Sequence, residues 1–320
     1  MPLIFLLWIA WAGAPMVAQV SAGYEEELQP GVCASSYSKG LEQLRQGQYT
    51  EALNSFNSGV RNFQIKDRDP NRACLYGMVG VAYIARLQGD WEKVRKIQQQ
   101  LSTSMLTSGV DLTSFGYAAE LAEFELDQGR PGEAEEIIRR VTKRFGTTVK
   151  ITNGYLLCQN LLVEAAMDRK DMGAAKEAYQ TGQDMWKRQK LTRPDLRMLK
   201  GRFERTGARM ERMQGNLEEA EKLARSAIAT HAKDLAEESW DGIQDKFELG
   251  EILYARQQLE EAAKSYQWVY VTIRDRLGKS QPLARRSLTQ LEALLRGSGH
   301  IESADRVRKV LDSLPAARAL

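Results

Sequence analysis

From residue 39 onward, apolar residues recur with the 3.6-residue period of an α-helix, and the apolar stretches come in pairs separated by short polar turns. The clearest pair has its first stripe at Leu196, Leu199, Phe203, Met210 and Met213 and its second at Ala220, Leu223, Ala224 and Ala227. Gly215 lies between the two stripes. The pattern predicts two antiparallel helices joined by a tight turn.

This helix pair repeats seven times, and each turn carries the same short phrase. The phrase is a small or polar residue, a bulky apolar residue or Pro two positions later, and in six of the seven copies Ala three further on. Glycine permits the positive φ that ends the first helix, and Ala lets the second helix approach closely. The phrases begin at Gly47, Gly89, Gly129, Lys170, Gly215, Gln257 and Gly299, at intervals of 42, 40, 41, 45, 42 and 42 residues.

A fixed period of this length is typical of a solenoid. One helix pair cannot bury both of its apolar faces, so neighbouring pairs must stack. We therefore predict an all-α fold, a right-handed superhelical solenoid of about seven antiparallel helix pairs over residues 39–315, with its core running along the array. Residues 23–38 are then an N-terminal segment and residues 316–320 a C-terminal tail.

The spacing of Gly47, Tyr49, Ala52 and Phe56 resembles the tetratricopeptide repeat, although that family usually has a period of 34 residues. The last copy is similar to the longer repeats of kinesin light chains, at Ile273-Arg274, Leu277-Gly278, Pro282, Leu288, Gly299, Glu302 and Ala304. The resemblance covers roughly residues 36–315. It implies a helical superhelix with a concave groove, but neither motor association nor a cargo.

Composition narrows the function classes. The 45 Lys and Arg residues nearly balance the 42 Asp and Glu residues, which excludes a domain dedicated to nucleic acid. Two His and three Cys provide no zinc cluster and no triad spacing, so we predict no enzyme activity, no cofactor and no metal. We expect His231 and His300 to lie at the surface or at helix ends, and Cys158 to be a small buried apolar residue.

The first 22 residues contain no ionisable side chain and end in a small-residue pattern at Val20 and Ala22. This pattern indicates a secretory signal, which predicts an extracellular or periplasmic protein. An uncleaved membrane anchor is an alternative, as is a cytoplasmic protein with a misassigned start. In an exported chain Cys33 and Cys74 could form a disulfide, while two free thiols fit the sequence equally well.

Four arginines in the fifth pair, Arg202, Arg205, Arg209 and Arg212, are spaced three, four and three residues apart and therefore share one helix face. In the register of the resembled family this face lines the concave groove, together with Asn160 of the fourth pair. The cluster predicts binding of an acidic peptide. The alternative is an internal ion network with the carboxylates of Glu123, Asp127, Glu164 and Asp168.

These observations predict a noncatalytic scaffold that binds a peptide segment in its groove, with exposed aromatic residues Tyr83, Phe247 and Tyr254 as pockets. A sensor whose superhelix changes shape on binding a peptide or small ligand is the alternative. The last repeat has no polar capping helix, so we also expect its end to pack on a partner or on a second copy of the chain.

Overall fold

The computed structural model describes residues 32–66, 72–108, 115–145 and 151–314. In these ranges the chain forms fourteen helices, paired as seven hairpins, and no strand. The first helices of the hairpins are α2 (Val32–Arg45), α4 (Arg72–Leu87), α6 (Phe115–Asp127), α8 (Asn153–Asp168), α10 (Pro194–Met213), α12 (Trp240–Ala255) and α14 (Pro282–Gly297). The second helices are α3 (Tyr49–Lys66), α5 (Trp91–Ser108), α7 (Pro131–Phe145), α9 (Met172–Trp186), α11 (Leu217–His231), α13 (Leu259–Arg276) and α15 (Ile301–Ser313).

All seven predicted turns lie where the sequence places them. The residue that opens each phrase has positive φ, from 62° at Lys170 to 84° at Gly215. Lys170 and Gln257 adopt this conformation without being glycine. The six alanines of the phrase are completely buried against the first helix, and Val94, which stands in place of the seventh, is 2% exposed. The hairpin prediction is confirmed.

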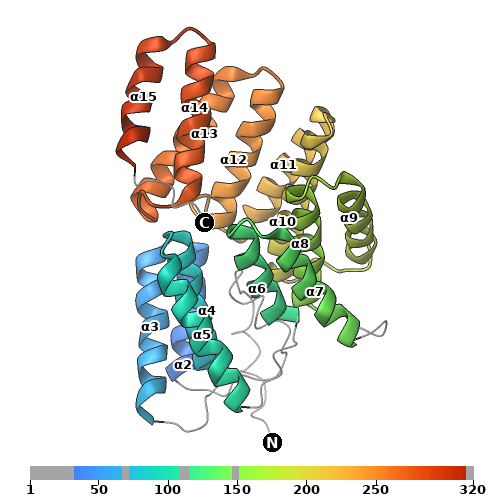
Figure 1. Cartoon of the computed structure of the whole chain (residues 1–320), viewed down its shortest axis with the longest axis vertical. Coiled ribbons are helices and arrows are strands. Elements are labelled where there is room, and N and C mark those ends of the chain that lie inside the picture. The colour runs from blue at the N-terminus through green and yellow to red at the C-terminus, as the bar shows by residue number, and fades with distance from the viewer. Residues whose placement is uncertain (1–31, 67–71, 109–114, 146–150, 315–320) are drawn as a thin grey trace, which may run out of the picture.

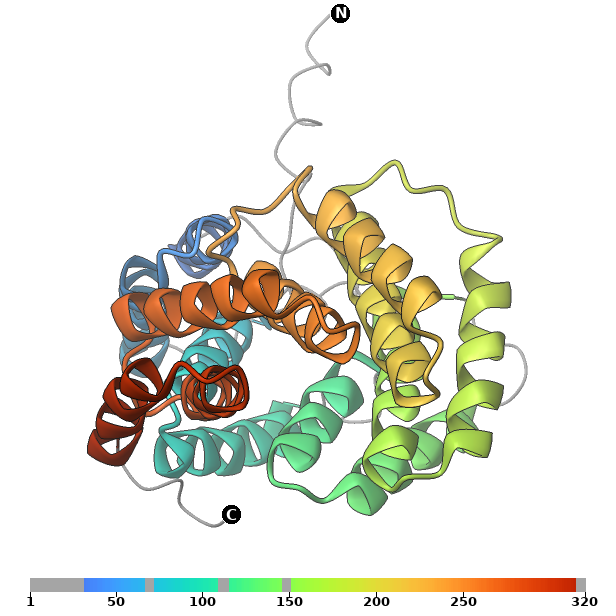
Figure 2. The ribbon, with the colours of Figure 1, turned by 90° about the horizontal axis from the view of Figure 1, so that it is seen from above.

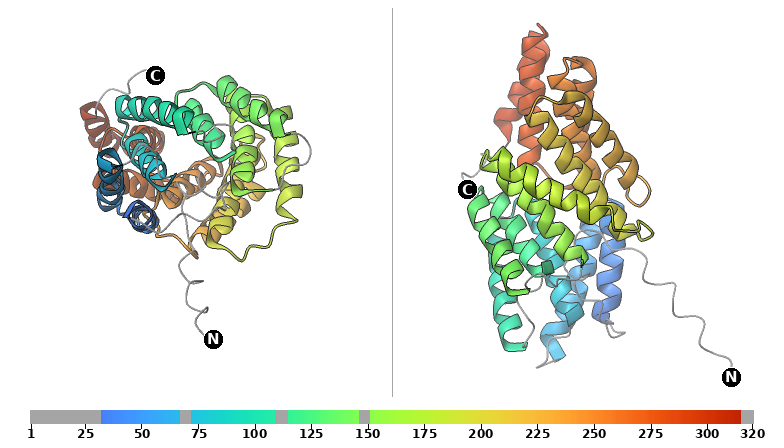
Figure 3. Two further views of the ribbon diagram at one scale, coloured as in Figure 1. Left: turned by 90° about the horizontal axis from the view of Figure 1, so that it is seen from below. Right: turned by 90° about the vertical axis from the view of Figure 1, so that its right-hand side faces the viewer.

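Successive hairpins stack through their first helices, with α2 on α4, α6 on α8, and α10 on both α8 and α12, and the second helices α3, α7, α11 and α13 each pack on the first helix of the next hairpin. Seen from above, the array curves through a full turn and its ends lie one over the other (Figure 2). The hairpins α2–α3 and α4–α5 lie below α12–α15 (Figure 1 and Figure 3). The chain is therefore a right-handed superhelix with two tiers.

The two tiers touch along a seam formed by the first two hairpin turns. The hydroxyl of Tyr49 donates a hydrogen bond to the carbonyl oxygen of Glu238 (3.0 Å), and the amide of Ala236 donates to the carbonyl of Arg45 (3.0 Å). At Gly47 a β-carbon would lie 2.7 Å from the same Glu238 oxygen. Glycine is thus needed at this turn for the contact between tiers as well as for its positive φ.

The seam changes the core from the one that the sequence predicts. One cluster of buried residues joins the first two hairpins to helices α10–α15, and a second occupies α6–α10. A small cluster at Ala85, Val94 and Phe124 lies between the second and third hairpins. The core predicted to run along the array is therefore divided into these clusters, because a full superhelical turn brings the first hairpins against the last ones.

Several predictions fall outside the described residues. These are the leader or anchor at residues 1–22, the segment before Val32, the tail at 316–320 and the side chains of Cys33 and Cys74. Helix α2 begins at Val32, upstream of residue 39, where the sequence pattern begins. Among the helices described, none combines the length and apolar character needed to cross a membrane.

Candidate functional site

The concave side of the superhelix encloses a channel, a cavity of about 270 Å³ between the two tiers. First helices of six hairpins contribute to its wall, and Trp91 at the start of α5 completes it. The wall consists of Arg86, Leu87, Trp91, Glu123, Leu126, Asp127, Glu164, Arg202, Trp240, Gln244, Gln281, Pro282, Leu283 and Arg286. Charged, amide and indole groups therefore converge on one hollow.

Arg202 and Arg205 of α10, which the sequence assigned to partner binding, are both more than 90% buried. Arg202 pairs with Glu123 and lies 3.6 Å from a Glu164 carboxylate oxygen. Arg205 faces the sixth hairpin, where it donates to Asp241, Asp245 and Gln244 at 2.9–3.1 Å. These two guanidinium groups are enclosed by acceptors of their own chain.

The other residues of the predicted partner site are also engaged internally. Arg209 bonds to Asp168 at 2.6 Å, and Arg212 to Glu248 at 2.7 Å. The side-chain amide of Asn160, itself 3% exposed, donates to Glu164 at 2.8 Å. The structure brings the four arginines to one face, as predicted, and it places carboxylates opposite all of them. Binding of an acidic partner by these five residues stays a prediction.

Two carboxylates of this network, Glu123 and Asp241, are held ionised by neighbouring cations. Burial alone would favour the neutral form of Glu123, but Arg202 and Arg86 outweigh burial and lower its pKa below the usual 4.5. Arg86 contributes through a 3.0 Å bond to Glu123. The pKa of Asp241 is likewise lowered, against burial, by Arg205 and His231. Asp127 differs from these two, because burial raises its pKa to about 6 although Arg86 opposes the rise.

Arg286 differs from the other arginines of the channel wall. Its guanidinium lies over the ring of Phe247, 4.8 Å from the ring centre, and its side chain is 54% exposed. Its ion pair is long, 3.6 Å to Glu251. Gln244 and Gln281 lie on the same wall, and the carbonyl oxygen of each accepts a bond within the chain, from Arg205 and from the Leu283 amide. Their NH₂ groups and Arg286 supply N–H donors at the channel.

The aromatic pockets that the sequence suggested are only partly present. Tyr83 and Phe247 are each 5% exposed and belong to the core that joins the two tiers, so the expectation that they are exposed is wrong. Tyr254 is 39% exposed, as expected. The seam explains the difference, because the lower hairpins cover surfaces that an open superhelix would leave in solvent. Two other aromatic residues, Trp91 and Trp240, line the channel instead.

His231 ends α11, as expected, but it is 2% exposed and therefore not at the surface. Its Nδ1 lies 2.5 Å from a carboxylate oxygen of Asp245, and its Nε2 lies 2.9 Å from the carbonyl oxygen of Met198. Both acceptors require a proton on the nitrogen, so this geometry holds the imidazolium form. His300, at the start of α15, is exposed, and Cys158 is buried as predicted.

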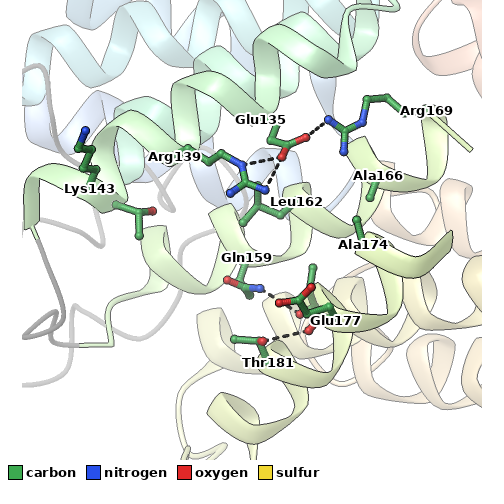
Figure 4. Close-up of a pocket in the computed structure, with 12 residues that line it drawn as sticks. Glu135, Arg139, Lys143, Gln159, Leu162, Ala166, Arg169, Ala174, Glu177 and Thr181 are labelled. Carbon is green, nitrogen blue, oxygen red and sulfur yellow. Dashed lines mark hydrogen bonds and ion pairs between the residues drawn. The ribbon is translucent and has the colours of Figure 1, made fainter. Parts of the chain in front are cut away.

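A second, larger hollow lies on the outer face, between α7 and α9 (Figure 4). We call it the outer trough. Its floor is α8, and its volume is about 690 Å³. Nothing in the sequence analysis pointed to it. The feature of the sequence that could have predicted this hollow is the set of small residues Ala166, Ala174 and Ala178 on α8 and α9.

Comparison with known proteins supports the repeat assignment. A tetratricopeptide repeat family model matches residues 207–235, the end of α10 and all of α11, which confirms the predicted repeat type. No curated protein matches the chain.

Several solved structures match over most of the chain. A Rap protein complexed with Competence and Sporulation Factor is 12% identical and has a TM-score of 0.60, with 86% of this chain and 74% of that one covered. The apo form of the quorum sensor NprR from B. thuringiensis is 11% identical, with a TM-score of 0.50 and 86% and 87% covered. A putative kinesin light chain from Podosopora anserina with TPR-like repeats is 21% identical, with a TM-score of 0.46 and 61% and 92% covered. At these identities the Rap and NprR matches establish the fold alone, a solenoid of tetratricopeptide-like helix pairs.

Proposed function

We propose that this chain is a noncatalytic scaffold that holds a segment of a partner protein in its channel. The observation that carries the proposal is the convergence of Arg286, Gln244 and Gln281 on one wall, with Trp91 and Trp240 lining the same cavity. A hollow with aromatic walls and a few directed polar groups is the usual form of a binding site. The Rap structure contains a bound factor and NprR is a quorum sensor, which supports a binding role for this fold.

The donors on this wall favour an acidic segment. Arg286 can bind a carboxylate with two parallel N–H groups, and the two amide NH₂ groups can bind carboxylate or main-chain carbonyl oxygens. The Arg286 guanidinium stacks on the ring of Phe247, which fixes its orientation and leaves its N–H groups at the channel. Acid recognition is then a property of Arg286 in the seventh hairpin, whereas the arginines of α10 hold neighbouring hairpins together.

The described wall carries few of the side chains that enzymes use as nucleophiles or bases. Its carboxylates at Glu123 and Asp127 form ion pairs with Arg86 at 3.0–3.1 Å, and the described wall includes no Ser, Thr, Cys, His or Lys. General acid–base chemistry needs a group that changes its protonation state near the working pH. Burial raises the pKa of Asp127 to about 6, so the wall has one such group, and its carboxylate is bound to Arg86.

A display library of peptides tests the proposal against the full-length chain. Bound peptides are expected to be enriched in Asp or Glu, and Arg286→Glu should weaken them at least about tenfold by replacing attraction with repulsion. Arg306→Glu is the matched control because Arg306 is exposed on α15, outside the channel. Fluorescence anisotropy gives the affinities and circular dichroism checks that both variants keep their helix content. Binders that tolerate Arg286→Glu, or a library without binders, would overturn channel binding.

A further inference from the structure

The outer trough is formed by one stripe of residues from each of three consecutive helices. Glu135, Arg139 and Lys143 of α7 follow each other at intervals of four, and α8 and α9 contribute similar rows. The rows span about 10–15 Å at 1.5 Å per residue. Figure 4 shows the α7 row on one side, the α9 row on the other and Leu162 and Ala166 between them. The shape is that of an elongated groove along helices.

One ion-pair cluster in the trough belongs to the repeat framework. Glu135 pairs with Arg139 on its own helix and with Arg169 at the end of α8 (Figure 4). Two hairpins later the equivalent residues form the same pairs: Glu221, Arg225 and Arg256. The pairs link a second helix to the following hairpin wherever they occur. They therefore do not by themselves mark a binding site.

The side chains that fill the gap differ between these two places. Between α11 and α13 the floor carries Leu253, which is 2% exposed, and Trp268 packs against the core with Lys246 over its ring at 5.6 Å. At the equivalent positions, 87 residues earlier, the trough has Ala166 and Thr181. The chain fills one gap with its own large side chains and leaves the other open.

The gap between α9 and α11 also receives large side chains of this chain. The ring of Tyr179 stacks on Phe203 with 4.6 Å between ring centres, and Trp186 packs on Phe203 at 6.2 Å. Gly182 provides the space, because a β-carbon there would approach the Phe203 ring to 2.5 Å. The outer trough thus lies beside a gap that is filled in the ordinary way of a core.

The walls of the trough indicate what kind of partner fits it. They are helices, whose backbone groups are already hydrogen-bonded, so an extended strand would find no row of backbone partners. A helix satisfies its own backbone, and the small side chains of Ala166 on α8 and of Ala174 and Ala178 on α9 let another helix approach to the usual 8–10 Å between axes. A fourth helix laid over α7, α8 and α9 would complete a small bundle.

Charge distinguishes the two rims. Arg139 is 71% exposed at its side chain and Lys143 is exposed one turn further along α7, whereas the α9 rim carries the exposed Glu177. Glu135 neutralises one cation of the α7 side, which leaves that rim basic. We infer that the outer trough binds an amphipathic helix of a partner protein that has small residues on its inward face and carboxylates along the α7 rim. The chain would then bridge two partners, one in the channel and one in the trough.

A display library of helix-forming peptides of about 18 residues, screened on the full-length chain, tests this inference. The expected binders have Ala or Ser on one face and Asp or Glu along one flank. Ala174→Glu should weaken them at least about tenfold, because it places bulk and negative charge in the trough. The substitution is compatible with folding, since position 174 is the third residue of α9, where Glu complements the capping residue Asp171.

Two matched controls separate binding from folding. Gly173→Glu adds the same charge at the neighbouring exposed position outside the trough and should leave binding unchanged. Arg139→Glu should weaken binding, whereas Arg140→Glu should not, although both arginines pair at 2.6 Å with a glutamate four residues earlier. The trough proposal would be overturned if no helical peptide bound, or if the bound peptides lost affinity with Arg286→Glu and kept it with Ala174→Glu and Arg139→Glu. Either result would leave the channel proposal standing.

Discussion

The gap between α7 and α9 and the gap between α11 and α13 are equivalent places in the array, two hairpins apart. Both are framed by a glutamate that pairs with two arginines, Glu135 in the first and Glu221 in the second. They differ in the floor, where Ala166 replaces the buried Leu253. Ala166 is itself 3% exposed, so what differs is its smaller volume, which leaves the gap above it open.

The inner sides of the two places differ as well. Asp245 of α12 is 1% exposed and bonds to His231, which ties α11 to α12 by an ion pair. Its equivalent on α8 is Cys158, whose thiol lies 3.3 Å from the carbonyl oxygen of Phe115. Burial raises the pKa of this thiol, so it stays neutral. At this pair of equivalent positions, the later hairpins are joined by buried charge and the earlier ones by a neutral contact.

Removing volume from the filled gap should have the largest effect. Leu253→Ala is expected to lower the free energy of unfolding by about 2–5 kcal/mol, because it removes buried apolar area and leaves a cavity. Leu162→Ala, on the half-buried floor of the trough, should cost clearly less. Urea denaturation followed by circular dichroism measures both. Equal costs would contradict the distinction between a filled and an open gap.

The buried ion pair of His231 predicts a pH dependence of stability that Cys158, at the position equivalent to Asp245, does not add near neutral pH. Burial alone would lower the pKa of His231, but Asp245 outweighs burial and raises it above 6.5, with Asp241 adding to the rise and Arg205 opposing it. The folded state therefore binds the proton more tightly than the unfolded state. Its stabilisation is complete below pH 6.5 and is lost as pH rises through the folded pKa, about 1.4 kcal/mol for each unit of elevation.

Comparison with His231→Gln isolates this contribution from other titrating groups. The stability difference between the native chain and the variant should be largest below pH 6.5 and should shrink toward alkaline pH. Thermal unfolding of the native chain and of His231→Gln, in matched buffers of equal ionic strength, gives the stability difference at each pH. A difference that is constant or grows with pH would show that His231 is not held as an imidazolium.

The sequence was sufficient to predict the features that form within a single hairpin. Positive φ at Gly47 or Gly215 and the buried alanines depend on neighbours within one hairpin, and their period makes them visible. The seam depends on superhelical pitch, which brings Tyr49 to Glu238 across 189 residues, and no repeat phrase encodes that distance. The exposure expected for Tyr83 failed for this reason.

The ion partners of the four arginines on α10 are easier to predict from the sequence than the seam between the tiers. Arg205, Arg209 and Arg212 bond to carboxylates 36–41 residues away, which is about one repeat. Residues one repeat apart on first helices face each other when hairpins stack. The predicted alternative of an internal ion network already named Asp168, and a search for opposite charge at that separation would also have found Asp241. The open trough depends on side-chain volumes that charge patterns do not reveal.

Filling the trough should have the smallest effect on stability and the clearest effect on binding. Thr181→Trp reproduces the residue that occupies the equivalent position on α13, so it should change the free energy of unfolding by no more than about 1 kcal/mol. It should also abolish binding of the helical acidic peptides, because the ring occupies their place. Gln180→Trp adds the same ring at an exposed position outside the trough and should preserve binding. If Thr181→Trp bound these peptides as well as the native chain does, side-chain volume would not be what separates the two gaps.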